Sequence, residues 1–289
     1  MGVQRIAAFS DGQSGGNPAG VMLCAELPNE AAMQAIAAEV GYSETVFAAP
    51  VEGGWRVRYF APEVEVEFCG HATIALGAAL ALQHDDGIFV LRLNNACITV
   101  EGRQTETTLT AALQSPPTRS APADEAIVKE ALALFGLTAE MLDPRLPPAI
   151  AHAGVDHLVL ALRSRALLAA MRYDLRAGRE LALRERIGTF SLIYPEAPQR
   201  FHARNPFPIG GVYEDPATGA AAAALAGYLR DLSWPHGGAI EIIQGEDMGM
   251  PSRLHAKITP EANAGIRVLG TARLIQRKMA PTQPALASM

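Results

Sequence analysis

The sequence predicts an α+β protein of two pseudo-symmetric domains, each a curved mixed β-sheet wrapped around one central helix. Strand-like runs outnumber helical ones, and each half of the chain holds an Ala-rich stretch that follows a polar loop. The two loops, 68–73 and 214–219, contain Ala-Thr pairs that lie 217 − 72 = 145 residues apart in a chain of 289 residues. Small side chains all round a helix let enclosing strands approach it closely. We therefore expect domains at 1–114 and 115–280 and a tail at 281–289.

Apolar spacing and turn residues predict the elements of the first domain. Asn29 and Gly41 favour the two ends of a helix, because apolar residues between them recur at i, i+3, i+4 and i+7. Within 63–68, glutamates alternate with apolar residues, which predicts a strand with one acidic and one buried face. The other predicted elements are a strand at 5–9, a hairpin of 45–47 and 55–60, an Ala-rich helix at 71–83 and a meander of 89–93, 96–101 and 105–113.

The second domain repeats this theme after the stretch 115–123, whose three prolines predict a linker. A polar pattern at 165–186 predicts a helical stretch, and the final strand at 266–275 is free to cross back to the first domain. Residues 281–289 are expected to be disordered. The other predicted elements are a helix at 127–135 ended by Gly136, an Ala-rich helix at 217–229 and strands at 157–162, 189–194, 200–204, 240–244 and 253–259.

Composition and charge exclude several classes of protein. The net charge is −6 without a cluster of Lys or Arg, so a nucleic-acid partner is not expected. The longest apolar stretch, 74–82, is far shorter than the ~20 residues that span a bilayer, and no signal peptide is recognisable. Three cysteines, Cys24, Cys69 and Cys97, stand at no zinc spacing. We expect a cytoplasmic protein without membrane association, metal or nucleotide.

The two Ala-rich helices provide candidate binding sites for a carboxylate where they begin. A helix start leaves about four backbone N–H groups without intrahelical partners and carries a partial positive charge. Two such starts that face each other across a cleft would place an anionic substrate between His71 and Asp215. Gly70 strengthens this interpretation, because a residue without Cβ lets a ligand reach the backbone N–H groups. The arrangement predicts proton chemistry without a cofactor.

Each candidate residue also has a purely structural interpretation. Glu44 lies at the mouth of an apolar strand, where lost hydration suits proton transfer, but a solvated loop glutamate fits the same position. His71 fits a structural histidine, and Asp215, which precedes a proline, fits an ordinary N-cap. Cys69 aligns with Glu214 of the second domain, so a symmetric pair of catalytic thiols is not predicted. We expect Cys69 to be a small buried hydrophobe.

Six motifs in order along the chain resemble the phenazine-biosynthesis PhzF-like family. They are Gly16-Asn17-Pro18-Ala19, Ser43-Glu44-Thr45-Val46-Phe47, Phe60-Ala61-Pro62 with Glu65, Phe68-Cys69-Gly70-His71-Ala72-Thr73, Glu214-Asp215-Pro216-Ala217-Thr218-Gly219, and Gln244-Gly245 with Met248-Gly249 and Pro251-Ser252. The resemblance implies a diaminopimelate-epimerase-like fold, no cofactor and a homodimer. The family's best-known member isomerises trans-2,3-dihydro-3-hydroxyanthranilate by moving a proton, with a glutamate as acid/base.

Carried over by motif, the resemblance implies Glu44 as the general acid/base, assisted by His71 and Asp215. Ala220 stands where the phenazine enzyme has serine, so one hydroxyl contact to a substrate is lost while the backbone N–H remains. The positions implied to contact the substrate are Asn17, Ser43, Gly70, Ala72, Thr218, Gly219 and Ala220.

The leading hypothesis is therefore a cofactor-independent isomerase that shifts a proton on a small cyclic or aromatic-precursor carboxylate through Glu44. The first alternative is an epimerase or racemase of a small amino or hydroxy acid, with Glu44 and Asp215 as opposed bases. The second alternative is a protein that binds a small ligand on the same fold without turnover.

Overall fold

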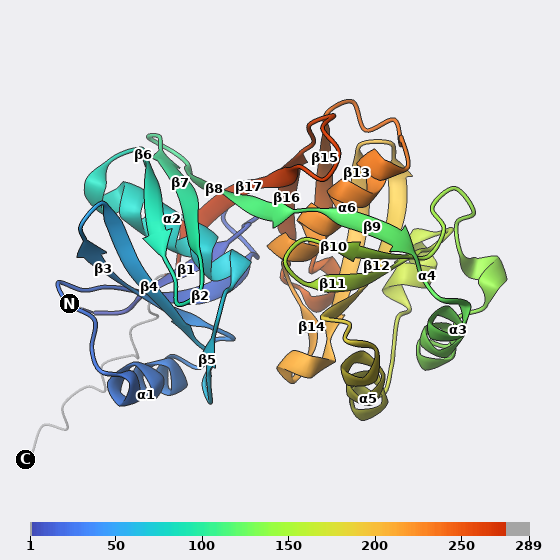
Figure 1. Cartoon of the computed structure of the whole chain (residues 1–289), viewed down its shortest axis with the longest axis horizontal. Coiled ribbons are helices and arrows are strands. Elements are labelled where there is room, and N and C mark those ends of the chain that lie inside the picture. The colour runs from blue at the N-terminus through green and yellow to red at the C-terminus, as the bar shows by residue number, and fades with distance from the viewer. Residues whose placement is uncertain (1, 276–289) are drawn as a thin grey trace, which may run out of the picture.

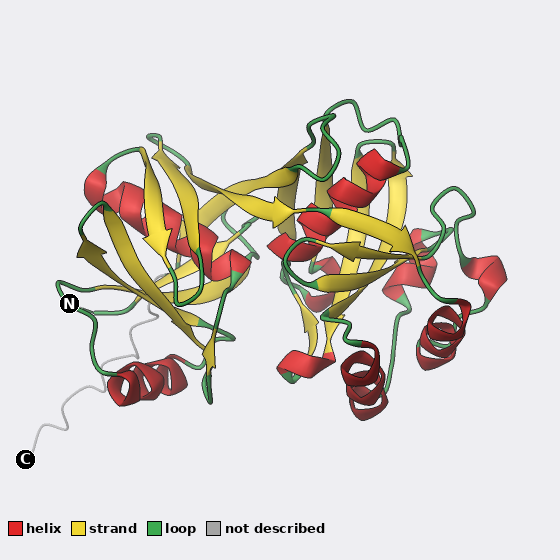
Figure 2. Cartoon of the chain, viewed as in Figure 1, coloured by secondary structure: helices red, strands yellow, loops and turns green. Residues whose placement is uncertain are grey.

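The computed structural model describes residues 2–275, and the expected tail at 281–289 lies outside this range. The described chain is a sheet-rich α+β fold with few helices (Figure 2). Its strands join into one mixed sheet of 17 strands. Figure 1 shows these strands gathered in two groups, each around one helix. These helices are α2 (Gly70–His84) in the first group and α6 (Gly219–Asp231) in the second.

The first group contains the predicted hairpin, meander and helices, and it adds one strand, β2. Helix α1 begins after Asn29, whose side chain accepts a hydrogen bond from Ala32 N–H, and ends at Gly41 in the left-handed conformation, as predicted. The added strand β2 lies parallel to β3. The elements are β1 (Gln4–Ala8), β2 (Asn17–Leu23), α1 (Glu30–Val40), β3 (Thr45–Val51), β4 (Gly54–Phe60), β5 (Glu65–Val66), α2, β6 (Gly87–Arg92), β7 (Cys97–Gln104) and β8 (Leu109–Pro117).

The second group contains the predicted strands and Ala-rich helix, and it adds the short strands β9, β10 and β14. Its elements are β9 (Arg119–Pro122), α3 (Glu125–Leu134), β10 (Ala149–His152), β11 (Asp156–Ala161), α4 (Arg165–Ala169), α5 (Leu175–Glu185), β12 (Thr189–Ala197), β13 (Arg200–Phe207), β14 (Val212–Asp215), α6, β15 (Ala239–Gln244), β16 (Ser252–Lys257) and β17 (Gly265–Leu274).

Helix α2 is buried along most of its length, because its small side chains let strands pack closely against it. Every residue from His71 to Ala81 is buried. The approach is tightest at Gly77, where a Cβ would lie 2.5 Å from Val100 Cγ2 of β7. A Cβ on Gly102 of β7 would lie 2.1 Å from the Gly77 carbonyl oxygen, so a larger residue at either glycine would displace the strand. Among residues 2–275, no helix is both long and apolar enough to cross a membrane.

The acidic alternating stretch at 63–68 does not form the predicted strand with a buried face. Only Glu65 and Val66 form strand β5, and the side chains of Val64 and Phe68 are 57% and 38% exposed. The prediction is wrong because a turn precedes β5, in which Ala61 N–H donates to the Val64 carbonyl over 2.8 Å. The alternation in sequence therefore starts in a turn rather than in extended chain.

The proline-bearing stretch 115–123, which the sequence predicts to be a linker, is not a loop but belongs to two strands. Strand β8 continues to Pro117 and pairs with β17, and β9 pairs with β10. Pro116 and Pro117 end β8 and Pro122 ends β9, positions where a missing N–H costs little. The predicted boundary between residues 114 and 115 falls inside β8, and the division into two domains stays a prediction.

The polar stretch at 165–186, which the sequence predicts to be helical, forms two separate helices, α4 and α5. Helix α5 begins after Asp174, whose side chain accepts from Ala177 N–H at 2.8 Å. Just before it, Tyr173 N–H donates to the Tyr213 hydroxyl at 2.9 Å. This backbone N–H therefore does not make the hydrogen bond that a continuous helix would need. The bond to Tyr213 comes from a distant part of the chain, so the local pattern could not predict the interruption.

Strand β17 connects the two groups of elements. The middle of β17 pairs with β16, its last residues pair with β1, and β8 runs antiparallel along most of its length. Figure 1 shows β8 and β17 passing together from one group to the other. The first and last strands of the described chain are therefore neighbours.

Candidate active site

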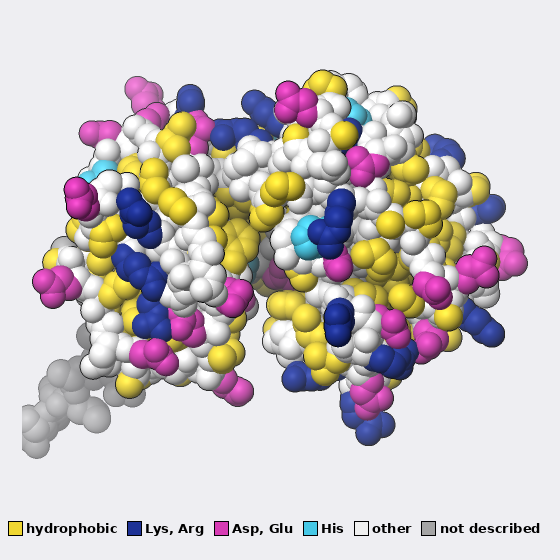
Figure 3. Space-filling view, in the orientation of Figure 1, with side chains coloured by type: hydrophobic (Ala, Val, Ile, Leu, Met, Phe, Trp, Pro, Cys, Tyr) yellow, Lys and Arg dark blue, Asp and Glu magenta, His cyan; other side chains and the backbone are white. Residues whose placement is uncertain are grey.

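The two Ala-rich helices begin next to each other. A Cβ added to Gly70, at the start of α2, would lie 3.9 Å from both Ala220 N and Gly219 Cα at the start of α6. First-turn N–H groups point out of a helix along its axis, so both starts direct partial positive charge toward this junction. Figure 3 shows the surface hollowed between the two groups of elements.

Glu44 lies in the loop that leads into β3, within reach of His71. Its Oε2 is 3.4 Å from His71 Nε2, and its side chain is 13% exposed. This oxygen is buried and makes no hydrogen bond within residues 2–275, because the contact to His71 lacks hydrogen-bond alignment. Ser43 Oγ lies 3.4 Å from the same His71 nitrogen. Glu44 therefore places one buried carboxylate oxygen beside the imidazole of His71.

Strand β2 fixes the backbone around Glu44. Gly20 N–H donates to the Glu44 carbonyl at 3.1 Å, which extends the pairing between β2 and β3 by one step. A Cβ on Gly20 would lie 2.6 Å from Thr45 Oγ1. The close approach of β2 that sets the position of Glu44 therefore requires glycine at position 20.

Cys69 lies beside the same imidazole. Its Sγ is 3.3 Å from His71 Nδ1. Burial, with the nearby Glu44 as a second cause, raises the pKa of the Cys69 thiol well above its usual value. Donor atoms of Glu44, Cys69 and His71 lie within 4.8 Å of one another, and zinc binds side chains of these three types. The expected absence of a metal therefore stays a prediction.

Asp215 ends strand β14 and is held by residues from both halves of the chain. Asn17 Nδ2 donates to Asp215 Oδ1 and Thr218 Oγ1 donates to Oδ2, each at 2.6 Å. Desolvation raises the pKa of Asp215 from 3.8 to about 6; Glu44 acts in the same direction, while His71 and the two hydrogen bonds oppose it. Asp215 thus changes protonation closer to neutral pH than an ordinary aspartate.

Asp215 is not the N-cap of α6, which corrects the interpretation drawn from the sequence. The helix begins at Gly219 with Thr218 as its N-cap, and the side chain of Thr218 makes no capping bond. Its hydroxyl turns back to Asp215 instead. The helix starts four residues after Asp215, and Thr218, which has an extended backbone, is the residue at its N-cap position.

Asn205 and Gln244, two residues that hold Thr218, are absent from the predicted site. Asn205 Nδ2 donates to Thr218 Oγ1 at 3.0 Å. Gln244 donates to Thr218 Oγ1 at 3.1 Å and accepts from Thr218 N–H at 3.3 Å. Gln244 belongs to one of the sequence motifs, but its position beneath the helix start follows only from the fold. Asn205 offered no signal beyond the Asn-Pro pair within a strand.

All the residues predicted to contact a substrate lie at this junction, although their surroundings differ. Ala72 is fully buried, and its N–H faces the Cys69 sulfur. The hydroxyl of Thr218 is occupied by its hydrogen bonds, which leaves the backbone of Gly219 and Ala220 as the nearer donors for a ligand. Ser43 is exposed, Gly219 is buried and Ala220 is partly exposed.

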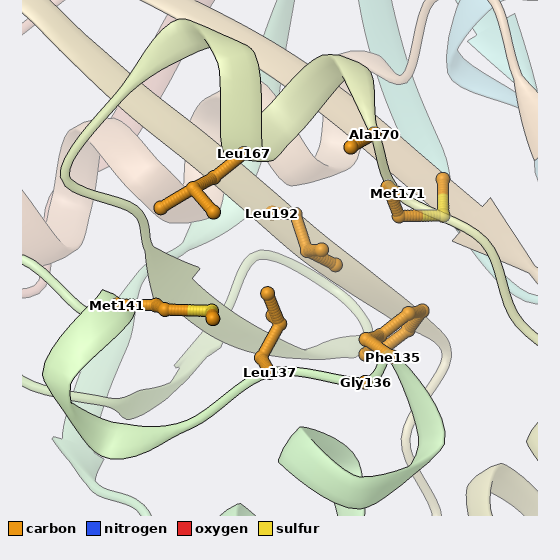
Figure 4. A pocket seen from close by; sticks show the side chains of 8 residues that line it. All are labelled: Phe135, Gly136, Leu137, Met141, Leu167, Ala170, Met171 and Leu192. Carbon is orange, nitrogen blue, oxygen red and sulfur yellow. The ribbon is translucent and has the colours of Figure 1, made fainter.

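Two other hollows lie away from this junction. An apolar cavity of about 120 Å³ is shown in Figure 4, and a second pocket is lined by residues of β15 and β16. Neither is lined by Glu44, His71 or Asp215. The apolar cavity has no ionisable side chain, so it offers no acid/base chemistry. Its lining residues are Phe135, Gly136, Leu137, Met141, Leu167, Ala170, Met171 and Leu192.

The family model for phenazine biosynthesis-like proteins, PhzC-PhzF, matches residues 6–277 of the chain. The chain belongs to this family. A relative from Pseudomonas aeruginosa, named trans-2,3-dihydro-3-hydroxyanthranilate isomerase, is 33% identical, with 87% of this chain and 88% of the relative covered. An uncharacterized isomerase from Deinococcus radiodurans is 34% identical, with 92% of this chain and 87% of the relative covered.

Solved structures of PhzC-PhzF proteins have the same fold. A PhzF-family phenazine biosynthesis protein from Bacillus anthracis superposes with a TM-score of 0.84 at 21% identity, and the match covers 95% of this chain and 96% of that chain. The predicted family is confirmed, and so is the prediction that this PhzC-PhzF protein is an isomerase, because relatives at 31–33% identity are named isomerases.

Proposed function

We propose that this PhzC-PhzF protein is a cofactor-independent isomerase that shifts a proton on a small cyclic or aromatic-precursor carboxylate, with Glu44 as the general acid/base. The observation that carries the proposal is the buried Glu44 Oε2, which lies 3.4 Å from His71 Nε2 and makes no hydrogen bond within residues 2–275. A positioned carboxylate oxygen that is free of donors suits proton abstraction from carbon. The names of the relatives support the reaction class.

In this mechanism the substrate carboxylate binds between the starts of α2 and α6, where both helices attract negative charge. Glu44 takes a proton from a substrate carbon, and the electron pair left behind delocalises into the neighbouring double bond. Glu44 then returns the proton to the carbon two bonds away, so the double bond moves and Glu44 is ionised again. His71 and Asp215 bind the polar groups of the substrate or relay protons.

The epimerase alternative assigns Glu44 and Asp215 as opposed bases. One observation favours it: the pKa of Asp215 is raised to about 6, so this residue can be the protonated partner while Glu44 acts as base. Solvent deuterium separates the two reactions. A proton shift moves a double bond, whereas epimerisation places deuterium at an inverted stereocentre.

The test is incubation in D₂O with trans-2,3-dihydro-3-hydroxyanthranilate, the substrate in the relatives' name, and with small amino and hydroxy acids. NMR of the products locates both the label and the double bond. Inversion without double-bond movement would replace the isomerase proposal by the epimerase. Binding of these compounds without turnover, unchanged in Glu44→Gln, would replace it by a ligand-binding protein.

The proposal extends to assembly and location: a homodimer in the cytoplasm, with each chain divided into two pseudo-symmetric domains. The two-domain interpretation is supported by the buried Ala-rich helix in each group of strands. The dimer is supported by the family resemblance. Analytical ultracentrifugation should give a mass about twice the 30.6 kDa of one chain. A mass of one chain at assay concentration would contradict the dimer.

A further inference from the structure

A chain of polar residues runs from Asp215 into the interior of the second group of elements. Thr218 Oγ1 lies 2.6 Å from Asp215 Oδ2, and Asn205 Nδ2 lies 3.0 Å from Thr218 Oγ1. Thr189 Oγ1 lies 3.2 Å from Asn205 Oδ1, and His157 Nδ1 lies 2.7 Å from Thr189 Oγ1. The three innermost residues, His157, Thr189 and Asn205, are at most 4% exposed.

The register of the sheet sets the order of this chain. His157 on β11 and Thr189 on β12 are paired residues in a parallel ladder. Asn205 on β13 and Asp215 on β14 are paired residues in an antiparallel ladder. The chain therefore crosses four neighbouring strands from β11 to β14 and reaches the candidate active site at its last step.

The protonation of His157 decides the direction of the hydrogen bonds. Burial lowers the pKa of His157 to about 4, with Asp156 opposing and His152 adding to the shift, so the ring is neutral at pH 7 and carries one N–H. Its Nε2 is buried and has no hydrogen-bond partner among residues 2–275. A buried N–H without an acceptor is rarer and costs more free energy than a buried acceptor without a donor. We therefore assign the proton to Nδ1, which faces Thr189, and leave Nε2 unprotonated.

With His157 donating to Thr189, each later residue has one donor that points toward Asp215. The Thr189 hydroxyl donates to Asn205 Oδ1, the Asn205 amide donates to Thr218, and the Thr218 hydroxyl donates to Asp215. The second hydrogen of the Asn205 amide donates back to Thr189 Oγ1 at 3.0 Å, which keeps the amide between the two hydroxyls. Aligned hydrogen bonds in a low-dielectric interior polarise one another, and donation to a carboxylate favours its ionised form.

We propose that His157, Thr189 and Asn205 are positioning residues that act through Thr218 to orient the Asp215 carboxylate and to favour its ionised form. Their importance for catalysis rests on the proposed function, in which Asp215 is an assisting residue. The hydrogen-bond chain itself can be tested without turnover.

Three titratable groups face Asp215 from the other side, and they must be considered in any titration. They are His71 and Cys69 at the start of α2 and Glu44 before β3. None of them belongs to the chain of hydrogen bonds. A change in the titration of Asp215 on altering Thr189 is therefore transmitted through Asn205 and not through these groups.

The test uses NMR of the full-length protein. Imidazole ¹⁵N shifts identify the protonated nitrogen of His157 at pH 7, and carboxyl ¹³C shifts give the pKa of Asp215, whose resonance is the one missing from Asp215→Asn. Thr189→Val keeps the shape of the side chain and removes the hydroxyl. We expect it to raise the pKa of Asp215 by about 0.5–1, while Thr189→Ser retains the wild-type value.

Thr118→Val is the matched control. Thr118 is also buried and hydrogen-bonded, to Arg230 and to the Ala264 carbonyl, but lies outside the chain. This variant should lower the melting temperature without moving the titration of Asp215. If Thr189→Val folds poorly, the double variant His157→Leu/Thr189→Val removes the imidazole donor that valine leaves without an acceptor, and it should produce the same rise.

Three results would overturn the inference: a proton on Nε2 of His157, a wild-type titration of Asp215 in Thr189→Val, or an equal change in Thr118→Val. A protein with the expected titration that shows no turnover on any substrate would count against the proposed function alone. The two failures are therefore distinguishable.

Discussion

Asn17 and Asp215 are joined by a 2.6 Å hydrogen bond although 198 residues separate them in the chain. The same Asn17 amide donates to the Ala217 carbonyl at 3.1 Å, so one side chain at the start of β2 holds the loop before α6 at two points. This contact lies where the ionisable residues of the two halves meet. The candidate active site therefore exists only when both halves of the chain are folded and correctly placed.

Replacing Glu44 by Gln should reduce turnover by about 10²–10⁴-fold, because the positioned general acid/base is lost. The shape of the side chain is preserved, so melting temperature and ligand affinity should change little. Initial rates on the substrate found in the D₂O experiment measure the effect. Glu52→Gln, in the exposed turn between β3 and β4, is the control and should retain full activity. Near-normal turnover in Glu44→Gln would remove Glu44 from the mechanism.

Replacing Cys69 by Ala should retain most activity. The thiol is buried and its pKa is raised, so little thiolate exists to act as base or nucleophile. Its contact with His71 is a packing contact in this interpretation. The informative comparison is between the Cys69 and Glu44 variants on one substrate. An inactive Cys69→Ala beside an active Glu44→Gln would show that the chemistry depends on the thiol.

The raised pKa of Asp215 predicts a definite pH dependence of stability. Between about pH 4 and pH 6 the native state holds more protons than the unfolded state, so the contribution of Asp215 to stability falls as pH rises. A pKa raised from 3.8 to about 6 corresponds to a loss of at most about 3 kcal/mol in the free energy of unfolding as the pH rises. Asp215→Asn lacks this titration, so its stability relative to wild type should improve between pH 4.5 and pH 7.

Urea unfolding at the two pH values measures this difference. Asp174→Asn, at the exposed start of α5, keeps a capping residue and serves as the control. Its stability relative to wild type should not change in this way. A relative stability of Asp215→Asn that declines toward pH 7 would show that the folded-state pKa of Asp215 lies below its unfolded value.

Treatment with a chelator should leave turnover intact, because the proposed mechanism uses only side chains and helix starts. The Glu44, Cys69 and His71 cluster makes this a sharp prediction, since its donor atoms lie close enough to share an ion. Activity before and after EDTA is the measurement, with Ca²⁺-saturated EDTA as the control. Loss of activity that a divalent metal restores would contradict the prediction.

Features that depend on neighbours in sequence could be predicted. The ends of α1 follow from Asn29 and Gly41, and the buried α2 follows from its small side chains. The motifs likewise located Glu44, His71 and Asp215 without any knowledge of their distances.

Features that depend on distant partners could not be predicted. Strands β2 and β14 are defined by their pairing with other strands, and the interruption between α4 and α5 depends on Tyr213. Asn205 reaches Thr218 only because of the register between strands. Asp215 resembled a cap in sequence, but the helix begins only at Gly219, after Thr218.

The pairing of β1 with the last residues of β17 has a consequence for synthesis on the ribosome. Residues 6–8 emerge first, but their partners at 272–274 come almost last. At 5–20 residues per second, translation to that point takes roughly 14–55 s. Throughout this time one edge of β1 is unpaired, and the first half of the chain cannot reach its final structure. A nascent chain stalled before residue 265 would carry open sheet edges on both β1 and β8, a hazard for aggregation.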